Sequence, residues 1–180
     1  MVREGKFIIT GRPGSGKSTC VAILMEGLRS KGIGFGGIRT PEVREGGIRT
    51  GFIVEDLLTG DRDLFASVKF SGGPSVSKYV IDLRRFESIA IPALTRAAKE
   101  CKVIIIDEIG KMELLSNKFV EIVREVWRSN SIVVATAPLA KISEVEELKR
   151  SSEVICMKRG EAERVAGYLL SRICRQLNAL

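Results

Sequence analysis

Eight consecutive residues near the N-terminus, Gly11–Ser18, have the spacing GxxxxGK[ST]. Glycines let such a backbone bend until successive N–H groups point inward, and a helix that starts near Lys17 adds unpaired N–H groups and the positive end of its dipole. This arrangement binds a polyphosphate: Lys17 reaches the β- and γ-phosphates, the Ser18 hydroxyl binds Mg²⁺, and the Thr19 N–H points toward the α-phosphate. The predicted nucleotide-binding set is Gly11, Arg12, Pro13, Gly14, Ser15, Gly16, Lys17, Ser18 and Thr19.

Two acidic residues, Asp107 and Glu108, follow a run of three isoleucines. Such a run predicts a strand buried on both faces, and an acidic residue at its carboxyl end completes a phosphate-and-metal site. We predict that Asp107 holds Mg²⁺ through a water and that Glu108 orients a second water for attack on the γ-phosphate. The chain has no histidine, so a general base has to be a carboxylate, a lysine, a tyrosine or the substrate itself.

Other polar side chains are candidates for contact with the γ-phosphate or the substrate. Thr136 ends the next predicted strand, where a hydroxyl can sense the γ-phosphate. An arginine close to the γ-phosphate accelerates transfer by roughly 10³–10⁵-fold. The basic candidates for this role are Arg39, Arg44, Arg49 and Lys111, and for each of them the competing interpretation is a solvated surface charge.

The composition is that of an ordinary globular protein: 180 residues, 44% hydrophobic and 28% charged. The net charge of +7 favours anionic partners. A nucleoside triphosphate and a nucleic acid both qualify, but no basic stripe interleaved with aromatic residues indicates nucleic acid. Four scattered cysteines predict reduced core residues, and the lack of a long apolar run or a signal-peptide core predicts a cytoplasmic protein, which we expect to be a monomer. Few asparagines and glutamines hint at a hot habitat.

Apolar periodicity predicts strands that alternate with helices. The predicted strands are 6–10, 33–38, 102–107, 132–136 and 153–157. The predicted helices are 18–31, segments beginning near 82, 116 and 143, and a closing helix with Val165, Leu169, Ile173 and Leu177 along one face. This alternation predicts an α/β fold, a three-layer sandwich in which helices cover both faces of a mainly parallel sheet, in one domain over residues 1–180. A glutamate directly after the metal-binding aspartate suggests an extra strand between the two motif strands.

Residues 46–78 interrupt the alternation. Segments 48–57 and 64–70, joined by the turn 58–61, predict a small β-hairpin inserted on the helical side of the domain, followed by a flexible loop over 71–78. Local signals predict a helix cap at Asp82, a kink or two abutting helices at Pro92, and a second cap at Ser116. They also predict a capping box at Ser143–Glu146.

Six stretches resemble the small nucleoside-triphosphatase family that includes the cancer-related nucleoside-triphosphatase. They are Thr10–Thr19, Thr40–Gly47, Arg49–Phe52, Tyr79–Leu83, Phe86–Leu94 and Ile106–Leu114, and the likeness covers about residues 5–136. The resemblance implies a P-loop fold and Mg²⁺-dependent hydrolysis of ATP, GTP and other triphosphates, with loose base selectivity and slow turnover. It carries the phosphate and metal roles onto Gly14–Thr19 and Asp107 and the water-activating role onto Glu108. The short segment 137–141 and Arg39, where an aromatic residue is more usual, depart from the family pattern and leave the base contacts open.

Two alternatives stay open on the sequence. The first is a P-loop kinase that phosphorylates a nucleoside or other small molecule, with its acceptor in the 46–78 insertion, although no arginine-bearing lid is evident. The second is a nucleotide-gated module that binds nucleic acid, suggested by the net charge of +7. Binding that weakens steeply with added salt would support the second alternative.

Overall fold

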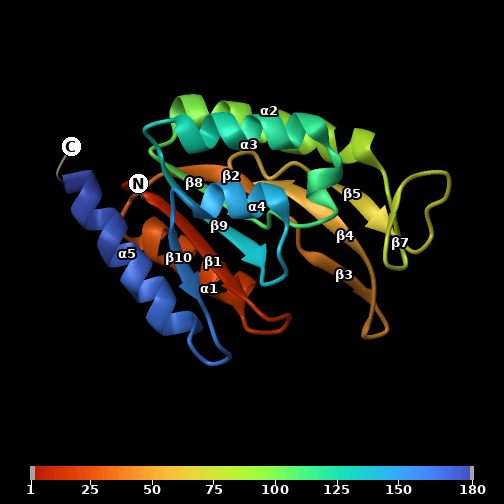
Figure 1. Ribbon diagram of the computed structural model, residues 1–180, viewed down its shortest axis with the longest axis horizontal. Helices are drawn as coiled ribbons and strands as arrows, with labels where there is room; N and C mark the ends of the chain where they lie inside the picture. The colour runs from red at the N-terminus through yellow and green to blue at the C-terminus, as the bar shows by residue number, and fades with distance from the viewer. Residues whose placement is uncertain (1–2, 179–180) are drawn as a thin grey trace.

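One ten-stranded sheet runs through the computed structural model, which describes residues 3–178 (Figure 1). Its strands are β1 (Lys6–Gly11), β2 (Phe35–Arg39), β3 (Glu42–Glu45), β4 (Ile48–Asp56), β5 (Arg62–Ser67), β6 (Ser75–Val76), β7 (Tyr79–Ile81), β8 (Val103–Asp107), β9 (Ile132–Pro138) and β10 (Glu153–Cys156). The helices within this range are α1 (Lys17–Ser30), α2 (Leu83–Glu100), a short 3₁₀ helix η1 (Glu113–Leu115), α3 (Asn117–Arg128), α4 (Ser143–Lys149) and α5 (Ala162–Asn178).

The half of the sheet that carries both motifs is parallel. Its strand order is β10-β1-β9-β8-β2, and each neighbouring pair runs in the same direction. The predicted extra strand between the two motif strands is confirmed, because β9 lies between β1 and β8. Parallel strands bring their carboxyl ends to one edge of the sheet. The segments that follow β1 and β8 therefore meet at that edge.

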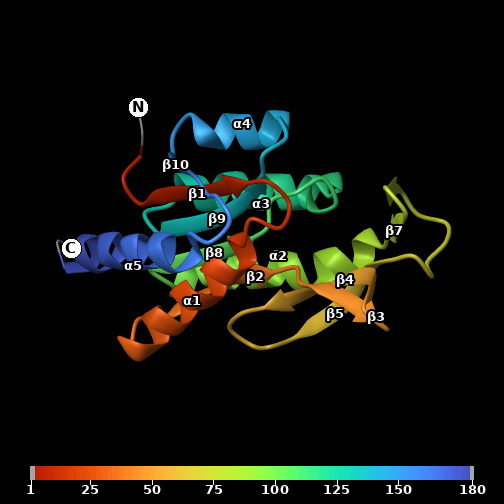
Figure 2. The ribbon, with the colours of Figure 1, turned by 90° about the horizontal axis from the view of Figure 1, so that it is seen from below.

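Helices cover both faces of this parallel half, as the three-layer prediction requires (Figures 1 and 2). Side chains alternate along each strand, so Ile8 of β1 packs with α2 and α3, while Phe7 and Ile9 pack with α1 and α5. β8 alternates in the same way and is buried along its whole length. The predicted buried β8 and the predicted α/β class are confirmed.

The segment 46–78 does not lie on the helical side. β4 pairs antiparallel with the outer edge of β2, and β5, β7 and β6 follow in order, so the hairpin lengthens the main sheet, while β3 pairs with β4. A free edge on β2 would leave backbone N–H and C=O groups unpaired, and the hairpin supplies their partners. The predicted loop 71–78 is also wrong in part, because β6 forms there and pairs with β7.

The two predicted helix caps form, but the predicted break at Pro92 does not. Asp82 accepts the N–H groups of Arg84 and Arg85, and Ser116 accepts that of Phe119, so both predicted caps are confirmed. The prediction of two helices abutting at Pro92 is wrong, because α2 is continuous through it. Its buried face, with Ala90, Ala93 and Leu94, packs against the core and outweighs one missing N–H.

The predicted capping box at 143–146 is wrong. Ser143 is itself the first residue of α4, and its hydroxyl bonds the Glu144 carboxylate at 2.6 Å instead of a backbone N–H. No disulfide joins the four cysteines, all of which lie within residues 3–178; Cys20 is buried as predicted, but Cys156 is exposed. Among the same residues, no helix has the length and apolar character needed to cross a membrane.

Candidate functional site

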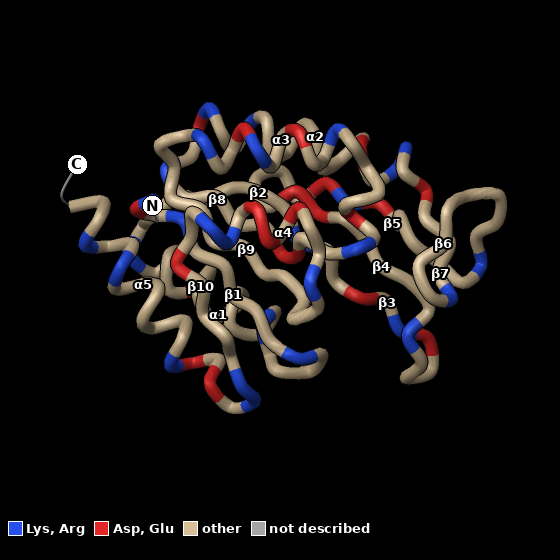
Figure 3. Tube along the Cα trace, in the orientation of Figure 1, with Lys and Arg blue, Asp and Glu red and all other residues tan. Residues whose placement is uncertain are grey.

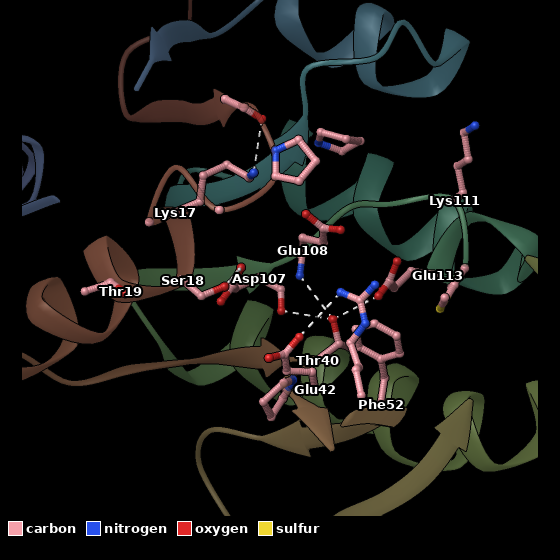
Figure 4. A pocket seen from close by; sticks show the side chains of 18 of the residues that line it. Lys17, Ser18, Thr19, Thr40, Glu42, Phe52, Asp107, Glu108, Lys111 and Glu113 are labelled. Carbon is pink, nitrogen blue, oxygen red and sulfur yellow. Dashed lines mark hydrogen bonds and ion pairs between the residues drawn. The ribbon is translucent and has the colours of Figure 1, made fainter. Parts of the chain in front are cut away.

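A cavity of about 770 Å³ opens where the carboxyl ends of β1 and β8 meet the antiparallel strands (Figure 4). Its walls are the phosphate loop, the segment from Asp107 to Glu113, and residues of β3, β4 and β6. A volume in this range, ~300–1,000 Å³, is typical of small-molecule sites. The cavity therefore has room for a nucleoside triphosphate and joins the two sequence motifs in one space.

The phosphate loop is already bent around the place where a phosphate group would bind. Gly14 and Gly16 have φ angles of 75° and 92°, a left-handed conformation that glycine adopts without strain. Gly16 directly precedes α1, so the unpaired N–H groups of the helix start at Lys17. The Lys17 ammonium folds back over the loop and donates to the Gly11 carbonyl at 3.1 Å. The loop thus presents N–H groups and one cation to the same space.

Two residues of the predicted nucleotide-binding set do not line the cavity with their side chains. Arg12 is exposed and is not among the residues that line it. Ser15 is buried, and its hydroxyl has no hydrogen-bond partner in the described structure. Buried hydroxyl groups are nearly always hydrogen-bonded, so this atom is consistent with a loop whose ligand supplies the missing partner.

The residues predicted to hold the metal lie together. The Ser18 hydroxyl donates to Asp107 Oδ1 at 3.3 Å. Oxygens this close can serve one ion, the hydroxyl directly and the carboxylate through one of the waters that Mg²⁺ usually keeps, as the predicted arrangement requires. Among residues 3–178 no cluster of three or more acidic, histidine or cysteine side chains could hold a metal. A hydroxyl with one carboxylate still suits Mg²⁺, which usually takes its other ligands from water and substrate phosphates.

Contrary to the sequence prediction, Thr136 does not lie where a hydroxyl could sense the γ-phosphate. Its side chain is fully buried, and its hydroxyl donates to Asp107 Oδ1 at 2.6 Å. It lies beside Asp107 because β9 is the neighbour of β8 in the sheet. Thr136 therefore orients the carboxylate of Asp107 and does not reach the cavity.

Glu108 enters the cavity from the end of β8, in a different direction from Asp107 (Figure 4). Burial raises the pKa of its carboxyl, the nearby Lys17 cation opposes this rise, and the charge of Asp107 adds to it. A carboxylate with a raised pKa is a better proton acceptor than an exposed one. The arrangement suits a group that receives a proton inside a partly dry site.

The basic candidates separate into two groups. Arg49 and Lys111 line the cavity, and the Arg49 guanidinium packs over the rings of Phe52 and Tyr79 at 5.4 and 5.6 Å. Arg44 lies outside the cavity, where it pairs with Glu42 and donates to the Gly47 carbonyl, and Arg39 pairs with Glu55 at 2.8 Å. The structure thus favours Arg49 and Lys111 and leaves Arg44 as a surface charge.

The sequence analysis missed two residues of this site, Thr40 and Glu113. The Thr40 hydroxyl bonds both the Asp107 carbonyl and Glu113, and the buried Glu113 lines the cavity. Both lie in the stretches that carry the family resemblance. A threonine after a strand and a glutamate before a leucine pair look like surface residues, so neither had a signal of its own.

A model of the NTPase family matches residues 6–169, which include the phosphate loop, the Asp107–Glu108 pair and every strand of the sheet. The chain belongs to the NTPase family. Its relatives in this family include the nucleoside-triphosphatase THEP1 of Korarchaeum cryptofilum, which is 64% identical over 173 residues, 96% of this chain and 89% of the relative. The corresponding protein of Thermofilum pendens is 48% identical over 130 residues, 72% of this chain and 71% of the relative.

Two solved structures of NTPases share the fold. THEP1 from the hyperthermophile Aquifex aeolicus superimposes with a TM-score of 0.76 at 36% identity, over 93% of this chain and 96% of that one. A human cancer-related nucleoside triphosphatase superimposes with a TM-score of 0.79 at 33% identity over the same shares. Both superpositions cover 93% of this chain, so the α/β architecture is shared over nearly its whole length.

Proposed function

We propose that this protein hydrolyses nucleoside triphosphates to the diphosphate and phosphate. The observation that carries the proposal is that Lys17, Ser18 and the Asp107–Glu108 pair line one cavity. Its membership of the NTPase family and the names of its relatives agree with this activity. Loose selectivity among ATP, GTP and other triphosphates remains part of the proposal, because the phosphate loop binds the part that all of them share.

The chain's own groups divide the work between holding the substrate and activating water. The N–H groups before and within the first turn of α1 bind the β-phosphate, and Lys17 moves from the Gly11 carbonyl to the β- and γ-phosphates. Mg²⁺ held by Ser18 and Asp107 would neutralise charge on the β- and γ-phosphate oxygens. Arg49 of β4 and Lys111 of the loop after β8 provide further positive charge.

Glu108 is the residue that we place at the attacking water. It accepts a proton from the water while the water oxygen bonds to the γ-phosphorus and the bond to the β–γ bridging oxygen breaks. The diphosphate leaves with the electrons of that bond, while Lys17 and the loop N–H groups stabilise its charge. In a chain without histidine, the Glu108 carboxylate is the base that we favour over a lysine, a tyrosine or the substrate itself, because it lines the cavity beside Lys17.

The test is the substitution Glu108→Gln, which keeps the size of the side chain and removes the proton acceptor. We expect the variant to bind a triphosphate in the presence of Mg²⁺ as the wild type does and to lose nearly all phosphate release. Glu121→Gln, on the exposed surface of α3, is the control for the loss of one carboxylate. Normal turnover by Glu108→Gln would show that another group activates the water.

The kinase alternative has one observation in its favour. The cavity continues past Glu108 to Glu42, Arg49 and Phe52 of the antiparallel strands, which leaves space beyond the γ-phosphate for an acceptor. A kinase would release little phosphate until an acceptor is added, whereas a hydrolase needs only water. Phosphate release from ATP and Mg²⁺ alone therefore separates the two activities.

The nucleic-acid alternative gains less support. Within residues 3–178, lysines and arginines are spread along the chain and are interspersed with acidic residues (Figure 3). Specific nucleic-acid binding would be expected to need a clustered basic surface. Hydrolysis that is unchanged by added RNA or DNA would exclude this alternative.

Three broader predictions belong to the proposal. The first is that residues 1–180 form one P-loop NTPase domain. The single sheet that joins all ten described strands supports it, and residues 1–2 and 179–180 lie outside the described part. A monomeric state is checked by light scattering after gel filtration. A cytoplasmic location is checked by fractionating the source cells.

A further inference from the structure

A second buried carboxyl lies next to Glu108. Glu113, at the start of η1, has only 4% of its surface exposed. The N–H of Gly110 donates to Glu113 Oε2 at 3.2 Å. A methyl group added to Gly110 would lie 2.8 Å from Glu108 Oε1 and 2.9 Å from Glu113 Oε2. The two carboxyl groups therefore approach each other across the space that the missing Gly110 side chain leaves.

The other oxygen of Glu113 is linked to both ends of the peptide unit between Asp107 and Glu108. Glu113 Oε1 lies 2.8 Å from the Thr40 hydroxyl oxygen. That hydroxyl oxygen is 3.2 Å from the Asp107 carbonyl oxygen and accepts from the Glu108 N–H at 3.4 Å. Thr40, at the end of β2, thus joins Glu113 to the backbone that carries the proposed catalytic glutamate (Figure 4).

Hydrogen-bond counting is consistent with a neutral Glu113. The Asp107 carbonyl already accepts the Thr40 N–H at 2.6 Å, so the Thr40 hydroxyl proton can go either to that carbonyl or to Glu113 Oε1. A protonated Glu113 donates to the Thr40 oxygen and still accepts the Gly110 N–H. An ionised Glu113 would face the Glu108 carboxyl across the Gly110 gap, and none of the ion pairs within residues 3–178 includes it.

The electrostatic surroundings agree with this count. Burial raises the pKa of Glu113 to about 8, the charge of Glu108 adds to the rise, and the hydrogen bonds from backbone N–H groups and Thr40 oppose it. Charged groups on every neighbouring element face the same cavity: Glu108 and Lys111 on the same loop, Asp107 on β8, Glu42 on β3, Arg49 on β4 and Lys17 of the phosphate loop. At pH 7 the neutral form of Glu113 is the larger population.

We propose that Glu113 is a positioning residue for hydrolysis: its neutral carboxyl ties the end of β2 and the loop after β8 together and so fixes Glu108 relative to the attacking water. This role rests on the proposed function of Glu108. It needs a group with one donor and one acceptor, aimed at Thr40 and at the Gly110 N–H. A glutamine has both, whereas an alanine has neither.

The experiment compares Glu113→Gln, Glu113→Ala, Glu108→Gln and the exposed control Glu121→Gln in the full chain. Phosphate release from ATP with Mg²⁺ is measured from pH 6 to 10, together with the affinity for a non-hydrolysable ATP analogue. We expect Glu113→Ala to lower kcat about 10–100-fold, the usual cost of losing a group that orients a catalytic one, with the analogue affinity unchanged. Glu113→Gln recovers most of that turnover at pH 7.

The pH profile is the readout that a merely structural role would not change. The kcat of the wild type declines as pH rises through about 8, because Glu113 then ionises, places a second negative charge beside Glu108 and draws the Thr40 hydroxyl proton away from the Asp107 carbonyl. The kcat of Glu113→Gln lacks this decline, since an amide does not titrate, and this comparison holds even if Glu113→Ala fails to fold.

Three results would overturn the proposal. If Glu113→Gln were as inactive as Glu108→Gln, the ionised carboxylate would be needed. If Glu113→Ala folded and turned over normally, or if wild type and Glu113→Gln shared one alkaline profile, Glu113 would not position anything. A wild type that released no phosphate at all would refute the proposed function itself, and with it this role.

Discussion

The hydroxyl of Ser18 donates to the Asp107 carboxylate at 3.3 Å, although 89 positions separate the two residues in the chain. The contact exists because β1 and β8 are parallel and are separated by the single strand β9, so that both end at the same edge of the sheet. It is the contact on which the proposed metal site depends. The predictions below test the groups on either side of it.

Lys17→Ala should abolish tight binding of triphosphates. The Lys17 ammonium lies over the phosphate loop, where it bonds the Gly11 carbonyl, and charge-assisted bonds to two phosphates contribute about 1.5–3 kcal/mol each. We expect the affinity for a fluorescent, non-hydrolysable ATP analogue to fall at least about a hundredfold. Lys31→Ala, exposed just beyond α1, is the control. Unchanged affinity in Lys17→Ala would place the phosphates elsewhere.

Thr136→Val should lower the affinity for Mg²⁺ without removing a contact to the substrate. Valine has the same shape, but it cannot donate to Asp107 Oδ1. Hydrogen bonds to charged groups contribute about 1.5–3 kcal/mol, so the Mg²⁺ concentration at half-maximal activity should rise about tenfold or more. Thr95→Val, half-buried on α2, is the matched control. A metal titration identical to that of the wild type would contradict this role of Thr136.

Arg49→Ala and Arg44→Ala form a matched pair, because both arginines pair with Glu42. Of the two, only Arg49 lines the cavity, so only Arg49 is placed to neutralise charge on the γ-phosphate. We expect Arg49→Ala to lower kcat by at least about tenfold and Arg44→Ala to leave it nearly unchanged. Thermal unfolding is measured alongside, since Arg49 also packs on Phe52 and Tyr79. Equal effects of the two substitutions would remove Arg49 from the mechanism.

Lys6 links stability to pH at the opposite end of β1. Its ammonium is buried and donates to the carbonyls of Ser129 and Ser131, and burial, aided by the charge of Arg3, lowers its pKa from 10.5 to about 8. Between these two values the unfolded chain binds more protons than the folded one, so stability rises with pH through this window.

Lys6→Met removes this linkage. Relative to the variant, the wild type should gain roughly 1–3 kcal/mol of unfolding free energy between pH 8 and 10.5, measured by denaturant titration. Lys102→Met, exposed just before β8, is the control. A constant difference between wild type and Lys6→Met over this range would mean that Lys6 titrates normally in the folded state.

The sequence predicted the parts of the site that follow from local pattern. A glycine loop before an amphipathic helix and an isoleucine run before two acids predict a phosphate-and-metal site when they occur together, and Lys17, Ser18, Asp107 and Glu108 line one cavity. The position of β9 followed from the chemistry of adjacent acids rather than from periodicity.

What the sequence did not predict depends on pairing across the sheet. The hairpin could not be placed, because alternation along a strand does not identify its neighbour. Thr136 and Glu113 were missed or misplaced for the same reason: their partners, Asp107 and Thr40, are distant in the chain and adjacent only after the strands align. Ser143 failed as a cap because a nearby carboxylate took its hydroxyl.

Strand β9 fills the gap between the two motif strands, and besides Thr136 it acts through its position alone. A bulky replacement for Ala135 or Val134, both wholly buried, would clash with the helical layers on the two faces of the sheet and displace β9, on whose pairing the spacing of β1 and β8 depends. Inactive variants recovered from random mutagenesis should therefore include substitutions at these two positions, with the sequence motifs intact.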